Sequence, residues 1–96
     1  MAGRSVFRRY RQHTDAILPI SHDVTDYLDQ SGLTLTTAAA ANIDSGLSIS
    51  GQAQTTAGWS ALVSSTDAAL YSFELWLTYS DGSREVLEFW IDVVDS

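Results

Sequence analysis

The sequence predicts an all-β fold: a small antiparallel immunoglobulin-like β-sandwich that follows a basic N-terminal arm. Three observations support this fold class. From residue 12 onward, apolar and polar residues alternate with a period of two, the pattern of strands with one buried face. Turn-forming residues separate six or seven such stretches at roughly 8–12-residue spacing, which is typical of β-sandwiches. A small barrel is the alternative fold. The chain has 96 residues and no cysteine, so we expect one domain over residues 13–96 without disulfides.

The predicted arm, residues 1–12, differs in charge from the rest of the chain. It holds four of the five basic residues, whereas residues 13–96 hold all 12 acidic residues. We expect the arm to be disordered in the isolated protein and to dock on an acidic neighbouring protein, with a frayed, solvated terminus as the alternative. The acidic remainder repels phosphate, so we expect no nucleic-acid partner. The predicted contact residues of the arm are Arg4, Phe7, Arg8, Arg9, Tyr10 and Arg11.

The first half of residues 13–96 carries the weaker strand signals. Residues 17–20 surround Pro19, and a proline in a strand belongs at a sheet edge or a bulge, so this strand is predicted to be peripheral. Residues 23–30 are predicted to form one helical turn with an Asp or Thr cap. Residues 33–37 alternate and lead into four alanines, a run too short to nucleate a helix unaided. We therefore interpret residues 38–41 as the end of a strand.

Two short strands and a long hairpin follow. Residues 47–50 form the first short strand, and the alternating apolar residues of 59–63 form the second. The hairpin is predicted over residues 70–79 and 84–94, where alternation is longest. Its predicted core residues are Leu75, Leu77, Leu87, Phe89 and Ile91.

The hairpin register follows from its two alternating patterns. A two-residue loop at Asp81 and Gly82 would pair Leu75 with Glu88, setting an apolar face against a charged one. A three-residue loop restores the match, because a one-residue slip reverses every side chain. Leu75 then lies opposite Phe89, or one step along if the loop is residues 80–82.

Trp76 and Trp90 occupy the phase opposite to the core residues of the hairpin. In the odd-loop register they fall on one side of the sheet, near each other and bordered by carboxylates. Exposed aromatic patches mark binding surfaces, and tryptophan is enriched at interface hot spots. We therefore predict that Trp76 and Trp90 bind a partner; the alternative is that another sheet or a terminal segment covers this face.

The sequence predicts no catalytic, metal or cofactor site. His13 and His22 lack the partners that a triad or a zinc site needs. Asp23, Asp26 and Asp29 lack the spacing of a calcium loop. The glycines are scattered and form no phosphate-binding loop, and no apolar run approaches the ~20 residues of a membrane span. We expect a protein that is not an enzyme and has no membrane partner.

Several segments resemble the phage fiber–tail adaptor proteins. The run Asp15–Leu28 resembles the opening of that family, and Val6-Phe7-Arg8-Arg9-Tyr10 is similar to its short basic arm. Gly46-Leu47-Ser48-Ile49 is similar to a Gly-Leu-Thr-Val strand, and Gly82-Ser83-Arg84-Glu85 to a Gly-Arg turn before the last strand. Residues 64–69 depart from a Ser-Gly-Gly-Thr-Ala-Gly loop that is common in the family.

The resemblance implies a structural virion protein of a tailed bacteriophage. Such a protein would join tail fibers to the tail or neck, in several copies in a ring or array. Its partners would be tail tube, neck and fiber proteins, and it would be assembled in the host cytoplasm. A capsid cement or decoration protein is the alternative, because it would use the same fold and arm. A carbohydrate-binding module is a third possibility, in which exposed tryptophans would stack on sugars.

Overall fold

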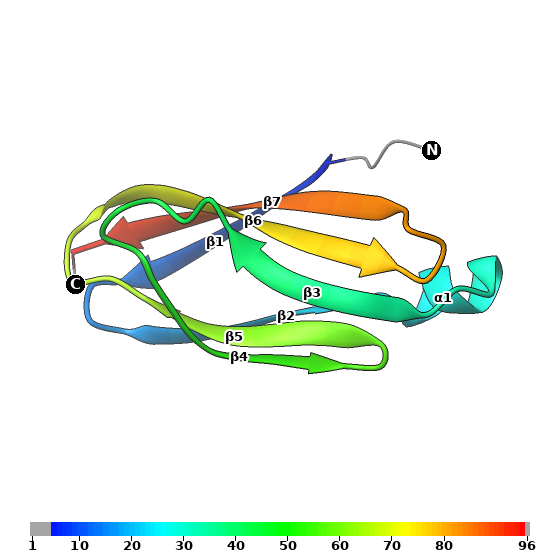
Figure 1. The fold of residues 1–96 in the computed structure, drawn as a ribbon. Helices are drawn as coiled ribbons and strands as arrows, with labels where there is room; N and C mark the ends of the chain where they lie inside the picture. Colours follow the sequence, from blue (N-terminus) through cyan, green and yellow to red (C-terminus); the bar gives the residue numbers. More distant parts are fainter. Residues whose placement is uncertain (1–4, 96) are drawn as a thin grey trace.

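The computed structural model describes residues 5–95, with side chains from residue 10 onward. The described chain forms seven strands and one short helix, arranged as two sheets packed face to face (Figure 1). In chain order the elements are β1 (Ser5–His13), β2 (Ile17–Asp23), α1 (Thr25–Ser31), β3 (Leu35–Ala41), β4 (Ser48–Thr55), β5 (Gly58–Ser64), β6 (Ala69–Tyr79) and β7 (Arg84–Val94).

The strand order confirms the predicted all-β sandwich. One sheet has four strands in the order β1-β7-β6-β3, and the other has three in the order β2-β5-β4. β1 runs parallel to β7, whereas the other strand pairs are antiparallel. The four-stranded sheet is therefore mixed, although we expected a wholly antiparallel sandwich. Lettered A to G, the strands form sheets A-G-F-C and B-E-D. In the constant-type immunoglobulin arrangement strand A lies in the other sheet, beside B.

The β6–β7 hairpin has the predicted odd loop. Leu75 pairs with Leu87 and Phe73 with Phe89, which is the register expected for a loop of residues 80–82. The Gly82 N–H donates to the Tyr79 carbonyl at 2.9 Å, and Gly82 has φ 86°, a conformation that glycine adopts without strain. The register predicted by matching the two apolar faces is therefore confirmed.

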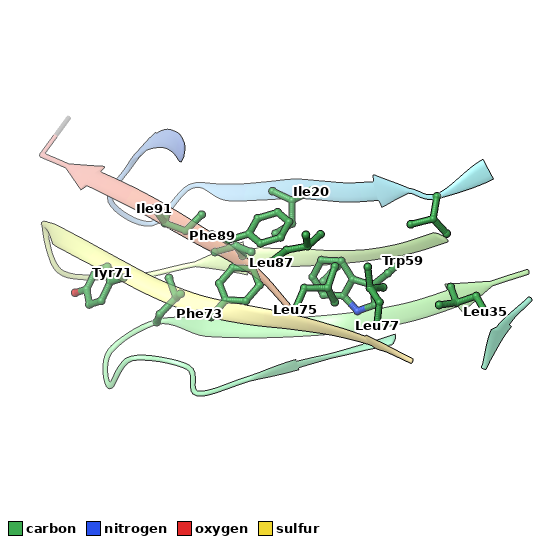
Figure 2. Close-up of a cluster of buried hydrophobic side chains, with 14 of the residues drawn as sticks. Ile20, Leu35, Trp59, Tyr71, Phe73, Leu75, Leu77, Leu87, Phe89 and Ile91 are labelled. Atoms are coloured by element: carbon green, nitrogen blue, oxygen red, sulfur yellow. The ribbon is translucent and has the colours of Figure 1, made fainter. Parts of the chain in front are cut away.

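The hydrophobic core lies between the two sheets (Figure 2). All five predicted core residues of the hairpin are fully buried, and Trp59 is buried at 2% exposure from the opposite sheet. The Trp59 ring packs against Phe73 and Phe89, with ring centroids 6.2 and 6.3 Å away. The other buried apolar residues are Ile20, Val24, Leu35, Leu47, Ala61, Val63, Tyr71, Phe73, Tyr79 and Val93.

β1 forms where we expected a disordered arm, so that prediction is wrong for residues 5–12. The edge of β7 offers nine in-register partners, from Ser5↔Val86 to His13↔Val94. The Tyr10 ring stacks on Phe89 at 6.1 Å between centroids, and the Gln12 side chain is buried. Backbone pairing and these inward contacts hold the basic segment on the sheet. Arg4 lies outside the described residues.

The weaker elements also form near their predicted positions. Residues 35–41, including the four alanines, are strand β3, as predicted. The expected helical turn is α1, but its N-cap is Val24 and not the predicted Asp or Thr. The Asp23 carboxylate, one residue before this cap, accepts the Thr25 N–H at 2.7 Å. α1 lies at the same end of the sandwich as the β6–β7 turn, and the β1–β2 connection lies at the other end (Figure 1). Tyr27 of α1 packs on Tyr79 at 4.8 Å between ring centroids.

Side chains of β4 reach across to the outer edge of β3. The Gln54 amide accepts the Ala38 N–H at 2.9 Å and donates to the Thr36 carbonyl at 3.2 Å. Gln52 accepts the Ala40 N–H at 3.0 Å and the Trp59 indole N–H at 3.2 Å. These amides satisfy backbone groups of β3 on the side that faces away from β6.

Candidate functional site

The candidate site is the outer face of the four-stranded sheet, on the side opposite the core. Trp76 pairs with Val86, and Trp90 pairs with Ser72, which places both tryptophans on this face as predicted. Both side chains are half-buried. Because the three-stranded sheet packs on the inner face, it does not cover them. Val86 and Trp90 are four positions apart on β7, which corresponds to about 13 Å along the strand.

Two glutamates lie between the tryptophans on this face. Glu74 of β6 and Glu88 of β7 are directly opposite each other. The Trp76 indole N–H donates to Glu74 Oε1 at 3.0 Å, and the Trp90 indole N–H donates to Glu88 Oε1 at 2.6 Å. Each strand thus carries a Glu-x-Trp unit in which the carboxylate fixes the indole two residues later. The two rings are held as fixed parts of the face.

Arg84 and Asn42 complete the surroundings of Trp76. The Arg84 guanidinium carbon lies 4.6 Å from the centre of the Trp76 ring, a cation–π contact. Asn42, which follows β3, donates a hydrogen bond from Nδ2 to Glu74 Oε1. On β3, the residue paired with Trp76 is Ala39, whose small side chain leaves that flank of the indole uncrowded. The face therefore combines rigid aromatic rings with both signs of charge.

The basic residues of β1 lie beside this face in the same chain. The Cα partner of Arg9 is Trp90, and that of the exposed Arg11 is Asp92. Phe7 and Arg8 also belong to β1, with the Cα partners Glu88 and Phe89. The Tyr10 ring packs against the core residue Phe89, and its role in partner binding stays a prediction. The predicted arm and the predicted tryptophan patch are thus two parts of one sheet.

The hydrogen bond from the Trp76 indole, followed by the one from Asn42, lowers the pKa of Glu74 below its ordinary value of 4.5. The ionised form of Glu74 is therefore favoured in the folded state, although Glu88 lies opposite. A carboxylate with a lowered pKa stabilises the fold above its unfolded-state pKa, and this contribution is lost as the pH falls through the folded-state pKa.

We expect Glu74→Gln to lower the melting temperature at pH 7 and to have a smaller effect at pH 3, because the stabilisation from a carboxylate with a lowered pKa decreases as the solution becomes acidic. Thermal melts of both proteins at the two pH values measure the difference. A variant that melts higher than the wild type at pH 7 would show that repulsion from Glu88 outweighs the two hydrogen bonds.

Four residues of this face were not predicted as site residues: Glu74, Glu88, Arg84 and Asn42. The sequence carried a signal for the two glutamates, because Glu74 and Glu88 each precede a tryptophan by two positions. Arg84 pairs with Thr78, two residues along β6 from Trp76, so the odd-loop register could have placed it on this face. Asn42 carried no signal, because it reaches Glu74 through the pairing of β3 with β6.

The other candidate groups do not converge on a reactive centre. His13 is exposed at the end of β1, and His22 lies on β2 as the Cα partner of Trp59. Asp26 and Asp29 are exposed on α1. Among residues 5–95, no three His, Cys, Asp or Glu side chains are grouped so that they could hold a metal ion. Within that range, no helix is long and apolar enough to cross a membrane.

Comparison with known proteins shows likeness of fold. No protein-family model matches the chain, and no curated protein matches it. The endo-fucoidan hydrolase MfFcnA4 of glycoside hydrolase family 107 matches 94% of this chain, with 14% identity and a TM-score of 0.62. A Photobacterium 2,6-sialyltransferase matches 99% of it, with 12% identity and a TM-score of 0.52. This chain spans 13% of the hydrolase and 18% of the sialyltransferase, so the likeness concerns a minor part of each.

Proposed function

We propose that this protein is a structural adaptor that binds other proteins through the outer face of its four-stranded sheet. One observation carries the proposal: Trp76 and Trp90 lie on the face away from the core, and Glu74 and Glu88 fix both indoles. Tryptophans held in one orientation lose little side-chain entropy on binding, which suits them to be interface anchors. Carboxylates beside them favour a partner surface that carries arginine or lysine.

The Arg84–Trp76 contact indicates the kind of group that this face receives. A guanidinium already lies 4.6 Å from the centre of the Trp76 ring within the chain. A partner's cationic side chain could bind near Glu74 and Glu88 with the same combination of ring and carboxylate. The partner would therefore present basic side chains to the face, and binding would weaken as salt increases.

The resemblance to fiber–tail adaptor proteins indicates in which particle this docking would take place. We propose that the protein is a virion component of a tailed phage that joins tail fibers to the tail or neck, in several copies. Capsid cement protein is the second setting, because the same face could dock on a capsid surface. Copy number per particle distinguishes them: tens of copies would indicate the tail and hundreds the capsid.

Carbohydrate binding is the competing function for exposed tryptophans. Both similar structures are carbohydrate-active enzymes, but identities of 14% and 12% support likeness of fold alone. The arrangement at Trp76 favours protein docking, because Arg84 lies against the ring that a sugar would need for stacking. Titration with a glycan panel, followed by tryptophan fluorescence, tests this alternative; saturable quenching that Trp76→Ala abolishes would favour the carbohydrate function.

The docking proposal predicts opposite behaviour of two tryptophans. Trp76→Ala should change the free energy of unfolding by about 1 kcal/mol or less, since its ring is on the outer face. It should weaken partner binding by about 2 kcal/mol or more, as at other interface hot spots. Trp59→Ala should instead cost about 3–5 kcal/mol of stability, because Trp59 is in the core.

Thermal melts of the two variants, together with their incorporation into phage particles, measure both effects. We expect a nearly unchanged melt and poor incorporation for Trp76→Ala. If Trp76→Ala lowers the melting temperature as much as Trp59→Ala, Trp76 stabilises the domain and the docking proposal fails. Normal incorporation of a well-folded Trp76→Ala protein would also contradict it.

A further inference from the structure

β1 is an edge strand of the four-stranded sheet. Its neighbour in that sheet is β7, which it pairs in parallel from Ser5↔Val86 to His13↔Val94 without a register shift. The Tyr10 ring stacks on the core residue Phe89. The edge of β7 therefore forms a complete binding site for one strand of this sequence, whichever copy of the chain supplies it.

The connection from β1 to β2 is short and partly strained. Residues 14–16 join His13 in one sheet to Ile17 in the other. Asp15 has φ 63°, in the left-handed region, which aspartate enters more often than most residues with a side chain but at a cost that glycine does not have. Its N–H donates to the Ser65 carbonyl at 2.9 Å, and the Thr14 N–H donates to Val94 at 2.9 Å. The sandwich thus holds this connection closed in an unfavourable backbone conformation.

Gln12 carries a second local cost next to the connection. Its side chain is buried at 6% exposure, and its Nε2 donates to the carbonyls of Ala16 at 3.0 Å and Val63 at 3.5 Å. Its Oε1 is buried without a hydrogen-bond donor in the described structure. A buried acceptor without a donor lowers the stability of the arrangement that contains it. Closure of β1 on its own β7 therefore includes the unfavourable conformation of Asp15, whereas the buried Gln12 Oε1 would accompany β1 onto the β7 of either copy.

We propose that β1 exchanges between copies of this chain, leaving its own β7 and pairing with β7 of a second copy. Opening at Asp15 lets residues 14–16 extend, and three extended residues span about 10 Å. The exchanged strand regains the backbone pairing and the Tyr10–Phe89 contact, while Asp15 leaves the left-handed region. Short hinges under strain promote such exchange, and the basic strand is attracted to the acidic remainder of another copy.

Cysteine pairs test the exchange directly, because the chain has no cysteine of its own. Arg11 and Asp92 are Cα partners on β1 and β7. Arg11→Cys and Asp92→Cys are made as separate proteins, refolded together at high concentration and oxidised. We expect a heterodimer linked through positions 11 and 92, identified by mass spectrometry after a non-reducing gel. It can form in quantity only where β1 of one copy lies on β7 of another.

Two controls complete this experiment. The double variant, refolded in dilute solution, should form an intramolecular disulfide and stay monomeric. Arg11→Cys refolded with Asp29→Cys reports random collision, because Asp29 is an exposed acidic residue on α1. Exchange predicts at least several-fold more 11–92 than 11–29 heterodimer. Equal yields overturn the proposal, and so does a dilute double variant that forms no intramolecular disulfide, since β1 then does not lie on β7.

Substitution of Asp15 tests the role of the hinge. Asp15→Gly relieves the strain of φ 63°, so we expect a dimer fraction several-fold lower than wild type by light scattering. Asp15→Pro fixes φ near −65° and should raise the dimer fraction; if it does not fold, the glycine variant decides. A glycine variant that dimerises as much as wild type contradicts strain-driven exchange. Trp76→Ala should leave exchange unchanged, which separates this proposal from docking by the outer face.

Discussion

Phe89→Ala should be among the most destabilising single substitutions in this domain. Phe89 is fully buried on β7, and its ring lies 5.0 Å from Phe73, 6.3 Å from Trp59 and 6.1 Å from Tyr10, measured between centroids. Truncation removes contacts to both sheets and to β1, and the rigid strands around it cannot close the cavity. The expected cost is about 3–5 kcal/mol, a large part of the roughly 5–15 kcal/mol that stabilises a small domain.

Urea unfolding followed by circular dichroism measures this loss. Leu70→Ala is the matched control, because Leu70 is a large apolar residue of the same hairpin that is 47% exposed. We expect the control to change stability by no more than about 0.5 kcal/mol. If Phe89→Ala is unfolded without urea, Phe89→Leu provides a measurable intermediate. Equal midpoints for Phe89→Ala and Leu70→Ala would show that the ring cluster does not stabilise the core as described.

Gly58→Ala should destabilise the sandwich by a different mechanism. A Cβ at residue 58 would lie 2.5 Å from the His22 carbonyl oxygen and 3.3 Å from Asp23 Cα. Both are backbone atoms of β2, so no rotamer change can relieve the overlap, and the strands must separate. This separation would also disturb the 2.7 Å hydrogen bond from the Val24 N–H to the Ala57 carbonyl, just before α1 begins.

Overpacking of this kind costs about 1–3 kcal/mol or more. In a domain of this size about 1 kcal/mol shifts the melting temperature by ~4–8 °C, so a decrease of roughly 10 °C is expected. Ser60→Ala is the control, because Ser60 is exposed two residues further along β5. A Gly58→Ala protein that melts with the control would mean that β2 and β5 are further apart than the structure places them.

The sequence predicted the parts of the fold that depend on alternation. The hairpin core from Leu75 to Ile91, the burial of Trp59 and the outward position of Trp76 and Trp90 all follow from the phase of apolar residues. Gly58 carried no such signal, because its need for a small residue arises from the approach of β2, a partner more than 30 positions away.

β1 was missed for a related reason. The positions of β1 in register with the buried residues of β7 are Val6, Arg8, Tyr10 and Gln12. Two of these four are polar, so the local pattern predicts a solvated arm. What makes the segment a strand is the free edge of β7 and the core surface around Phe89, which belong to the C-terminal part of the chain. The segregation of positive charge singled out this segment from the rest of the chain, but it did not predict that the segment forms a strand.

The glutamine side chains on β3 have a consequence for solubility. An unprotected strand edge is a template on which further chains add, and sheets that grow in this way precipitate as fibrils. Gln52 and Gln54 already occupy the N–H groups of Ala40 and Ala38, so an incoming strand would first have to displace both amides. The β3 edge of the four-stranded sheet is thereby protected against the addition of further strands. Gln54→Ala should accordingly shorten the lag before aggregation in concentrated solutions, even where the melting temperature barely changes.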